Sequence, residues 1–232
     1  MVDVTLRQYL PGRKDTLRRA RRRERTARGQ LASAARRYAA LGWPVCQGAH
    51  PEPAAGGRGR ACSCDRIGCP APGAHPVSPA WQMQASADPG AVGRSGAAAP
   101  DANVVLVTGR VFDVLDAPAV AGLAALEQME RSGVAPGPVA GAGGRALFFV
   151  ATRGAHAAQD EWWPCRLDCV PDDEPAAAGL RWHCRNSYVL APPSRDGTGQ
   201  AARWLRAPEG RPLPDAVRLL EYLGDAGDEQ AR

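Results

Sequence analysis

The sequence predicts a mixed domain of helices and strands, of class α/β or α+β, built around one sheet. Segments with a helical repeat alternate irregularly with short apolar runs that are typical of strands. The clearest run, ANVVLVTG at residues 102–109, is continuous, rich in β-branched residues and ended by glycine, as expected of a strand buried on both faces. A chain of 232 residues can bury one sizeable core, so one domain with tails is expected.

Residues 12–30 form a dense basic run, GRKDTLRRARRRERTARGQ. A helix can begin at Asp15, whose carboxylate can accept hydrogen bonds from the amides of the first turn. Arginines occupy every face of this helix, so the segment has no apolar stripe to bury. Two interpretations stay open: a solvated helical or disordered tail, and an electrostatic arm for phosphate backbones.

From Leu31 the apolar spacing becomes helical and stops at Gly42. Further on, Asp88 followed by Pro89 marks the start of a short helix. The other expected elements are strands at 43–48, 102–109, 111–118, 145–152, 187–194 and 203–208, and helices at 119–133 and 214–226. The expected organisation is a basic arm at 1–30, a domain at 31–206 with a cysteine-rich loop at 46–76, and a helical tail at 207–232.

The bulk composition bears on compartment and partners. The formal net charge is +5, and arginine supplies nearly all of the positive charge. No segment has the apolar length of a signal peptide or a membrane span, so a cytoplasmic protein with no membrane partner is expected. In a reducing compartment the seven cysteines are more often metal ligands or buried thiols than disulfides.

Four metal-binding side chains lie in one stretch, CSCDRIGCPAPGAHP at residues 62–76. Zinc prefers a tetrahedron of thiolate and imidazole ligands, and the glycines and prolines between them permit the tight turns that such a site needs. The predicted ligands are Cys62, Cys64, Cys69 and His75, with Cys46 and His50 as reserves. Four protein ligands close the coordination shell, so the expected Zn²⁺ is structural; reduced thiols in a surface loop are the alternative.

Two further cysteines, Cys165 and Cys169, are more ambiguous. One helical turn would place both thiols on the same face, where they could bind a metal together with His183 or Cys184. Buried thiols are the simpler interpretation, because free cysteine commonly behaves as a small apolar residue.

Several short segments occur in an order that is similar to a known family. They are AARRYAALGWPV, the Cys/His loop ending in PGAHP, ANVVLVTG, VFDVLDAP, GGRALFF and SYVLAPPSRDGTG. Over residues 34–204 this series resembles the bifunctional DNA primase/polymerase (prim-pol) domain of plasmid, phage and actinobacterial proteins. The resemblance implies an archaeo-eukaryotic primase-like core with an RRM-like sheet and a small zinc-binding insertion. It also implies template-directed nucleotidyl transfer by two metal ions.

The catalytic positions depart from the family pattern. Two-metal transfer needs clustered carboxylates, and the family places two acids one residue apart on a strand, where both point to the same face. By the resemblance, Asp116 stands at the first of these positions and Pro118 at the second. Asp113 lies three residues before Asp116, so the two carboxylates point to opposite faces unless a bulge intervenes. Ala146 stands at the family's histidine, and Arg181 at its third acid.

These departures favour a non-catalytic relative that binds nucleic acid or nucleotides, with reduced or no polymerase activity. The expected partner is DNA or RNA, single-stranded, and a replicative helicase or another replication protein is a candidate protein partner. The residues expected to contact nucleotide or nucleic acid are Gly143, Gly144, Arg145, Arg181, Arg185, Tyr188 and Ser194, with Trp182 as a further stacking candidate. A Gly-Gly pair also suits a hairpin turn, and Ser194 with Asp196 also suits a turn.

Two alternatives stay open. An active primase/polymerase would use Asp113 and Asp116 as catalytic residues, and only then would it need Mg²⁺ or Mn²⁺. A protein-interaction or regulatory domain would use the basic arm for localisation alone.

Overall fold

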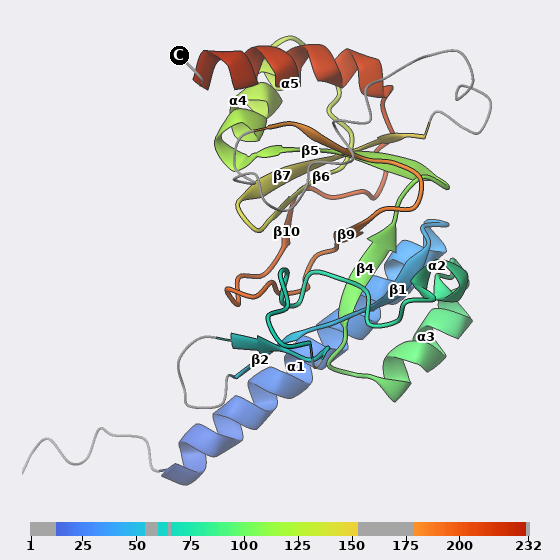
Figure 1. The fold of residues 1–232 in the computed structure, drawn as a ribbon, viewed down its shortest axis with the longest axis vertical. Helices are drawn as coiled ribbons and strands as arrows, with labels where there is room; N and C mark the ends of the chain where they lie inside the picture. Colours follow the sequence, from blue (N-terminus) through green and yellow to red (C-terminus); the bar gives the residue numbers. More distant parts are fainter. Residues whose placement is uncertain (1–12, 54–59, 65, 153–178, 231–232) are drawn as a thin grey trace, which may run out of the picture.

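The computed structural model describes residues 13–53, 60–64, 66–152 and 179–230 and has an α+β architecture (Figure 1). All strand pairs within the described residues are antiparallel, which excludes the parallel sheet of an α/β fold there. The expectation of one sheet is wrong, because the apolar runs at 102–109 and 111–118 enter two different sheets.

The described strands form two main sheets and one hairpin. The three-stranded sheet has the order β1 (Val45–Gly48), β4 (Asn103–Val107), β9 (Tyr188–Leu190). The five-stranded sheet has the order β10 (Arg203–Arg206), β6 (Val139–Ala142), β7 (Arg145–Ala151), β5 (Phe112–Pro118), β8 (Arg181–His183). The hairpin pairs β2 (Pro51–Pro53) with β3 (Arg60–Cys62).

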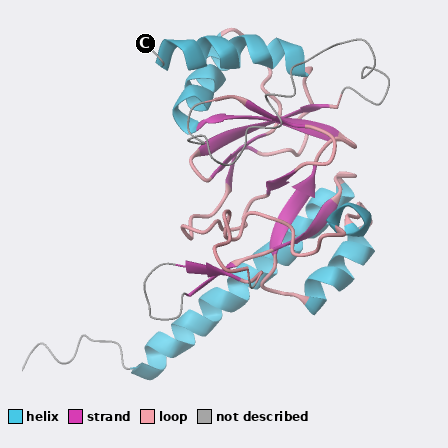
Figure 2. Ribbon diagram, in the orientation of Figure 1, coloured by secondary structure: helices cyan, strands magenta, loops and turns pink. Residues whose placement is uncertain are grey.

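The helices are divided between the two main sheets (Figure 2). One group, α4 (Ala119–Arg131) and α5 (Ala216–Gln230), covers the outer face of the five-stranded sheet. The other group, α1 (Arg13–Ala40), α2 (Trp81–Gln84) and α3 (Pro89–Ala98), lies beside the three-stranded sheet. None of the helices in the described ranges combines the length and the apolar character that crossing a bilayer demands.

Side chains alternate between two apolar clusters along β5. Phe112 and Val114 point to a cluster shared with α1 and the three-stranded sheet, whereas Leu115 and Ala117 point to α4 and α5. The first cluster is therefore the layer that joins the two sheets. Its aromatic rings contact one another, with centroids 4.7–6.4 Å apart; they are Tyr38, Trp43, Phe112, Phe149 and Trp204.

Helix α1 is fixed to this layer by a buried tyrosine. The Tyr38 hydroxyl donates a hydrogen bond to the Pro192 carbonyl at 2.5 Å and accepts one from Trp204 Nε1 at 2.8 Å. Burial raises the pKa of Tyr38 to about 12. The C-terminal half of α1 is thus part of the core, whereas the described side chains of residues 18–26 are all exposed.

Most predicted elements are confirmed, with shifted ends. The basic run and the apolar segment that follows it form the single helix α1, which ends before Gly42 at a φ of +79°. Asp88 caps α3 and accepts from the amides of Gly90 and Ala91 at 3.0 and 2.9 Å. The predicted C-terminal helix is present and packs on α4 through Leu219 and Leu223.

Four short strands, β2, β3, β6 and β8, were not predicted. Each has only three or four residues, and none shows an alternation long enough to stand out. Their partners in the sheet, rather than their own propensity, determine their conformation.

Candidate metal centre and the Asp116 cluster

The cysteine-rich loop is held at both of its ends. Cys62 lies on β3, which pairs with β2. At the other end, Pro76 forms a β-bridge with Gly48, and the His75 carbonyl accepts from the Ala49 amide at 2.8 Å. The two ends of the loop therefore meet beside β1, although 13 residues separate Cys62 from His75.

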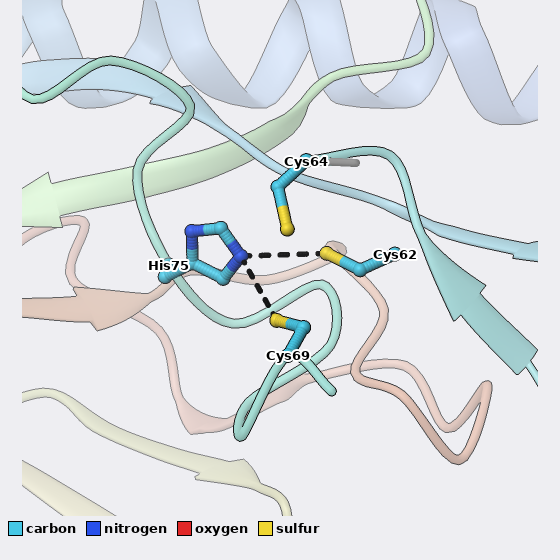
Figure 3. Close-up of side chains that lie close together, drawn as sticks. All are labelled: Cys62, Cys64, Cys69 and His75. Atoms are coloured by element: carbon cyan, nitrogen blue, oxygen red, sulfur yellow. Dashed lines mark hydrogen bonds between the residues drawn. The ribbon is translucent and has the colours of Figure 1, made fainter. Parts of the chain in front are cut away.

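The structure brings the four predicted zinc ligands together (Figure 3). One ligand atom from each of Cys62, Cys64, Cys69 and His75 lies within 4.8 Å of every other. His75 Nε2 is 3.3 Å from Cys62 Sγ and 3.4 Å from Cys69 Sγ. A tetrahedral zinc ion, with bonds of about 2.3 Å to sulfur and about 2.0 Å to nitrogen, needs ligand atoms about 3.5–3.8 Å apart. The four side chains therefore fit zinc in type, number and spacing.

The surroundings of these ligands also suit a metal. His75 Nδ1 donates to the Pro76 carbonyl at 2.8 Å, which fixes the tautomer in which Nε2 carries the free lone pair. The Gly73 amide donates to Cys62 Sγ at 3.4 Å, as expected for a sulfur that carries negative charge when it is a ligand. A hydrogen bond from the Arg66 amide lowers the pKa of the Cys64 thiol to about 7, whereas burial raises that of Cys69 to about 11.

The other candidate ligands lie elsewhere. Cys46 is buried on β1 beside Val105, and desolvation raises its pKa to about 12. His50 is 3.3 Å from Glu52 and is not part of the cluster. Cys184 does not belong to it either, and Cys165 and Cys169 lie outside the described residues.

The Cys/His loop packs on the segment that follows β9. Asn103 Nδ2 donates to the carbonyls of Gly73 and Arg195, both at 2.7 Å, and Asn103 Oδ1 accepts from the Arg195 amide at 3.1 Å. Asn103 is only 4% exposed, so these bonds are shielded from water.

Gly73 allows this close approach, and its replacement tests it. Gly73 has a φ of +74°, and a Cβ there would lie 2.8 Å from the Arg195 carbonyl oxygen and 2.9 Å from Pro51 Cδ. Gly68, in the same loop, has a φ of +69° with nothing within 4 Å. We expect Gly68→Ala to lower the free energy of unfolding by about 1–2 kcal/mol, because alanine is strained at a positive φ. Gly73→Ala should lower it by about 1–3 kcal/mol more, because its Cβ also clashes with Arg195 and Pro51. Urea unfolding of both variants measures the difference, and equal losses would contradict the packing.

The two candidate catalytic carboxylates lie on opposite faces of β5. The pairing of β5 with β7 is continuous from Phe112 to Pro118, so no bulge brings the side chains to one face. Asp116 shares the face of Val114, and Asp113 shares that of Leu115. Both side chains are buried, with Asp116 5% and Asp113 3% exposed. The prediction that they point to opposite faces of the strand is confirmed.

Asp116 is bound on both sides by cationic or polar groups. Arg145 Nε donates to Asp116 Oδ1 at 2.6 Å, and the same guanidinium donates to the carbonyls of Asp116 and Gly179 at 2.9 and 2.8 Å. His183 Nε2 lies 3.1 Å from Asp116 Oδ2, and His183 Nδ1 lies 3.0 Å from the Ser187 hydroxyl. Cross-strand pairing places Arg181 directly opposite Asp116. We refer to Asp116, Arg145, Arg181, His183 and Ser187 as the Asp116 cluster.

Among the predicted contact residues, only Arg145 and Arg181 belong to the Asp116 cluster. Gly143 and Gly144 form the two-residue turn between β6 and β7, with φ of +55° and +76°, so the hairpin interpretation is confirmed. Arg185 lies in the turn after β8, with its Cα next to Gly109.

Three other side chains have structural roles. Tyr188 is on β9, where its ring meets Trp81 edge-on at 5.3 Å. Trp182 is buried at 8% exposure in the cluster with α4 and α5, so in this conformation its ring does not offer a surface to a base. Ser194 is fully buried, and its hydroxyl accepts a hydrogen bond from the Val104 amide at 2.8 Å and donates one to the Val104 carbonyl at 3.2 Å, which fixes the turn.

Ser187 and Asn103 were not predicted as site residues, and His183 was considered only as a metal ligand beside Cys165 and Cys169. A period of two in the stretch RWH would have put Arg181 and His183 on one face, but only if this stretch had been assigned as a strand. Asn103 carries no signal of its own, since its partners come from segments 30 and 92 residues away.

Comparison with protein-family models assigns residues 35–216 to the family described as bifunctional DNA primase/polymerase, N-terminal. The match includes the Cys/His loop, β5 with Asp116, and the segment after β9. Comparison with curated proteins finds no match to this chain. Because the family model matches more than half of the chain, the chain belongs to the prim-pol family.

Proposed function

We propose that this protein is a prim-pol relative that binds the phosphates of nucleic acid or nucleotides at the Asp116 cluster and has reduced or no polymerase activity. The observation that carries the proposal is the occupation of both Asp116 carboxylate oxygens, one by Arg145 and the other by His183. A metal ion at Asp116 would have to share these oxygens with the Arg145 guanidinium, whose positive charge repels it. The five-stranded sheet, with α4 and α5 on one face, would be the primase-like core.

The described residues do not fit a two-metal centre. Such a centre needs several carboxylates around one point, yet within the described ranges the Cys/His loop is the one group of three or more candidate ligands. At the position next to Asp116 on the same face stands Pro118, which cannot bind a metal. Arg181, opposite Asp116, brings a positive charge where a third carboxylate would be required.

The charge of the Asp116 cluster suits an anion. The cluster brings two guanidinium groups to one carboxylate: Arg145 forms a short ion pair with Asp116, and Arg181 stands opposite Asp116 on β8. Arginine binds phosphate through a planar fork of donors, and His183 on the same face adds a further polar group. Phosphate recognition here would need no divalent ion.

The zinc site has a different role in this proposal. Cys62, Cys64, Cys69 and His75 would hold a structural Zn²⁺ whose coordination shell is complete. The ion would fix the loop against Asn103 and the segment after β9. It would take no part in nucleotide chemistry.

Primer extension tests the loss of activity. The wild-type protein and Asp116→Ala are incubated with a primer–template, nucleotides and either Mg²⁺ or Mn²⁺, beside an active prim-pol enzyme as positive control. We expect the wild type to extend no more primer than Asp116→Ala. Extension by the wild type that the substitution abolishes would overturn the proposal and favour the active-enzyme alternative.

Nucleotide binding in EDTA tests the phosphate site. We expect Arg181→Gln on β8 to weaken binding of a nucleoside triphosphate about tenfold, because one charge-assisted contact is lost. Arg203→Gln on β10, at the opposite edge of the same sheet, is the matched control and should have little effect. Equal affinities of the wild type and Arg181→Gln would contradict the assignment.

A further inference from the structure

The N-terminal part of α1 carries a concentrated positive charge on a helix that projects from the body of the protein (Figure 1). Between residues 18 and 28 seven of eleven side chains are arginine and one, Glu24, is acidic. Side chains 18–26 are all exposed. The segment is therefore accessible to a large partner from several directions.

The arginines between residues 18 and 28 are unevenly spaced around the helix. At about 100° per residue, Arg18, Arg22, Arg25 and Arg36 share one face, which runs about 27 Å along the helix axis. Arg19, Arg21 and Arg28 lie on the two flanks of this face, at about 60–100° from Arg18, and Arg23 lies about 140° from it. Ala20 and Ala27 lie on the opposite side, in line with Leu31, Ala34 and Tyr38, the residues that pack on the body.

Repulsion between these arginines destabilises the helix when no partner is bound. Arg18 with Arg22, and Arg21 with Arg25, are like-charged pairs at i,i+4 spacing, which destabilise a helix. Within the described residues the acidic partners Glu24 and Asp101 both pair with Arg28, so they do not balance the arginines closer to the N-terminus. A polyanion that binds the projecting face would remove this repulsion.

We propose that the arginine face of α1, defined by Arg18, Arg22, Arg25 and Arg36, binds duplex DNA through its phosphates by lying in the major groove. A helix with side chains is about 10–12 Å wide and the major groove of B-DNA is about 12 Å wide. Flanking arginines on both sides of the face would reach the phosphates of both groove walls. This inference rests on the proposed function, in which the protein binds nucleic acid. The surface concerned is α1 rather than the Asp116 cluster.

Single strands are a poorer fit to this surface. Proteins that bind them without sequence preference combine positive charge with aromatic rings on which the bases stack. Residues 13–37 contain no aromatic side chain. The groove of A-form RNA is also deep and narrow, which disfavours insertion of a helix.

Fluorescence anisotropy with labelled duplex DNA, and with the matching single strand, tests the proposal on the full chain. The variant is Arg18→Gln/Arg22→Gln/Arg25→Gln, in which glutamine keeps the helix propensity. The control is Arg203→Gln/Arg211→Gln/Arg218→Gln, which makes the same change of charge at exposed positions outside α1. We expect the arm variant to lose at least about tenfold in duplex affinity and to reduce the slope of log K against log[salt] by about 2.7, from about 0.9 per phosphate contact.

Each outcome either supports the proposal or overturns it. A loss confined to the arm variant and larger for the duplex supports the proposal. Equal losses of duplex affinity in the arm and control variants would mean that only the net charge of the protein matters. An unchanged duplex affinity of the arm variant would mean that the arginine face is only solvated. Either result would overturn the proposal. A loss confined to the single strand would also overturn it. Nucleotide binding by Arg181→Gln is measured separately, so failure of the Asp116 cluster and failure of the arm are distinguishable.

Discussion

Protein purified without chelator is expected to contain about one equivalent of Zn²⁺, and Cys69→Ser is expected to lose the ion and much of the stability of the fold. Structural zinc contributes apparent binding free energies of about 10–16 kcal/mol in small zinc domains, comparable with the whole stability of a typical domain. The loop between Cys62 and His75 has little apolar packing of its own, and its contacts pass through Asn103 to the segment after β9. Loss of zinc should therefore loosen both segments.

Metal analysis by mass spectrometry and thermal unfolding with and without EDTA provide the measurements. Cys46→Ala is the control, because Cys46 is a buried thiol outside the zinc cluster. This control should keep its zinc, although removal of a core side chain lowers its melting temperature. Substoichiometric zinc in the wild type, or an unchanged melting temperature in EDTA after the zinc has been removed, would contradict a structural metal.

The second large effect is expected for Arg145→Met, which should destabilise the protein by about 3–5 kcal/mol. The side chains of Arg145 and Asp116 are 13% and 6% exposed, so removal of the guanidinium leaves a buried carboxylate without its main counter-charge. The substitution also removes the donor to the carbonyls of Asp116 and Gly179. Chemical denaturation monitored by tryptophan fluorescence measures the loss.

A double-mutant cycle separates the ion pair from general loss of packing. Adding Asp116→Asn to Arg145→Met removes the buried charge, so we expect the double variant to recover part of the stability lost in the single one. Arg206→Met is the matched control: Arg206 pairs with Glu130 where both side chains are about one-third or more exposed, and its loss should cost about 0–1 kcal/mol. Additive effects of the two substitutions at the Asp116 cluster would show that the pair is not coupled.

The sequence by itself determined the features whose causes are local. Cys62, Cys64, Cys69 and His75 lie within one short turn-rich stretch, so their convergence needs only the turns between them. The Asp88 cap, the Gly143–Gly144 turn and the opposite orientation of Asp113 and Asp116 likewise follow from neighbouring residues and from the period of two in a strand.

Only the tertiary structure decided what surrounds Asp116 and how the strands are ordered. His183 and Arg145 reach Asp116 across 67 and 29 residues of sequence, and Asn103 joins segments that no local pattern relates. The apolar runs at β4 and β5 are both suited to burial, yet they enter different sheets because their partners are distant strands. The physical reason is that a strand's propensity specifies extension and burial, whereas its neighbour and register are selected by the packing of the whole chain.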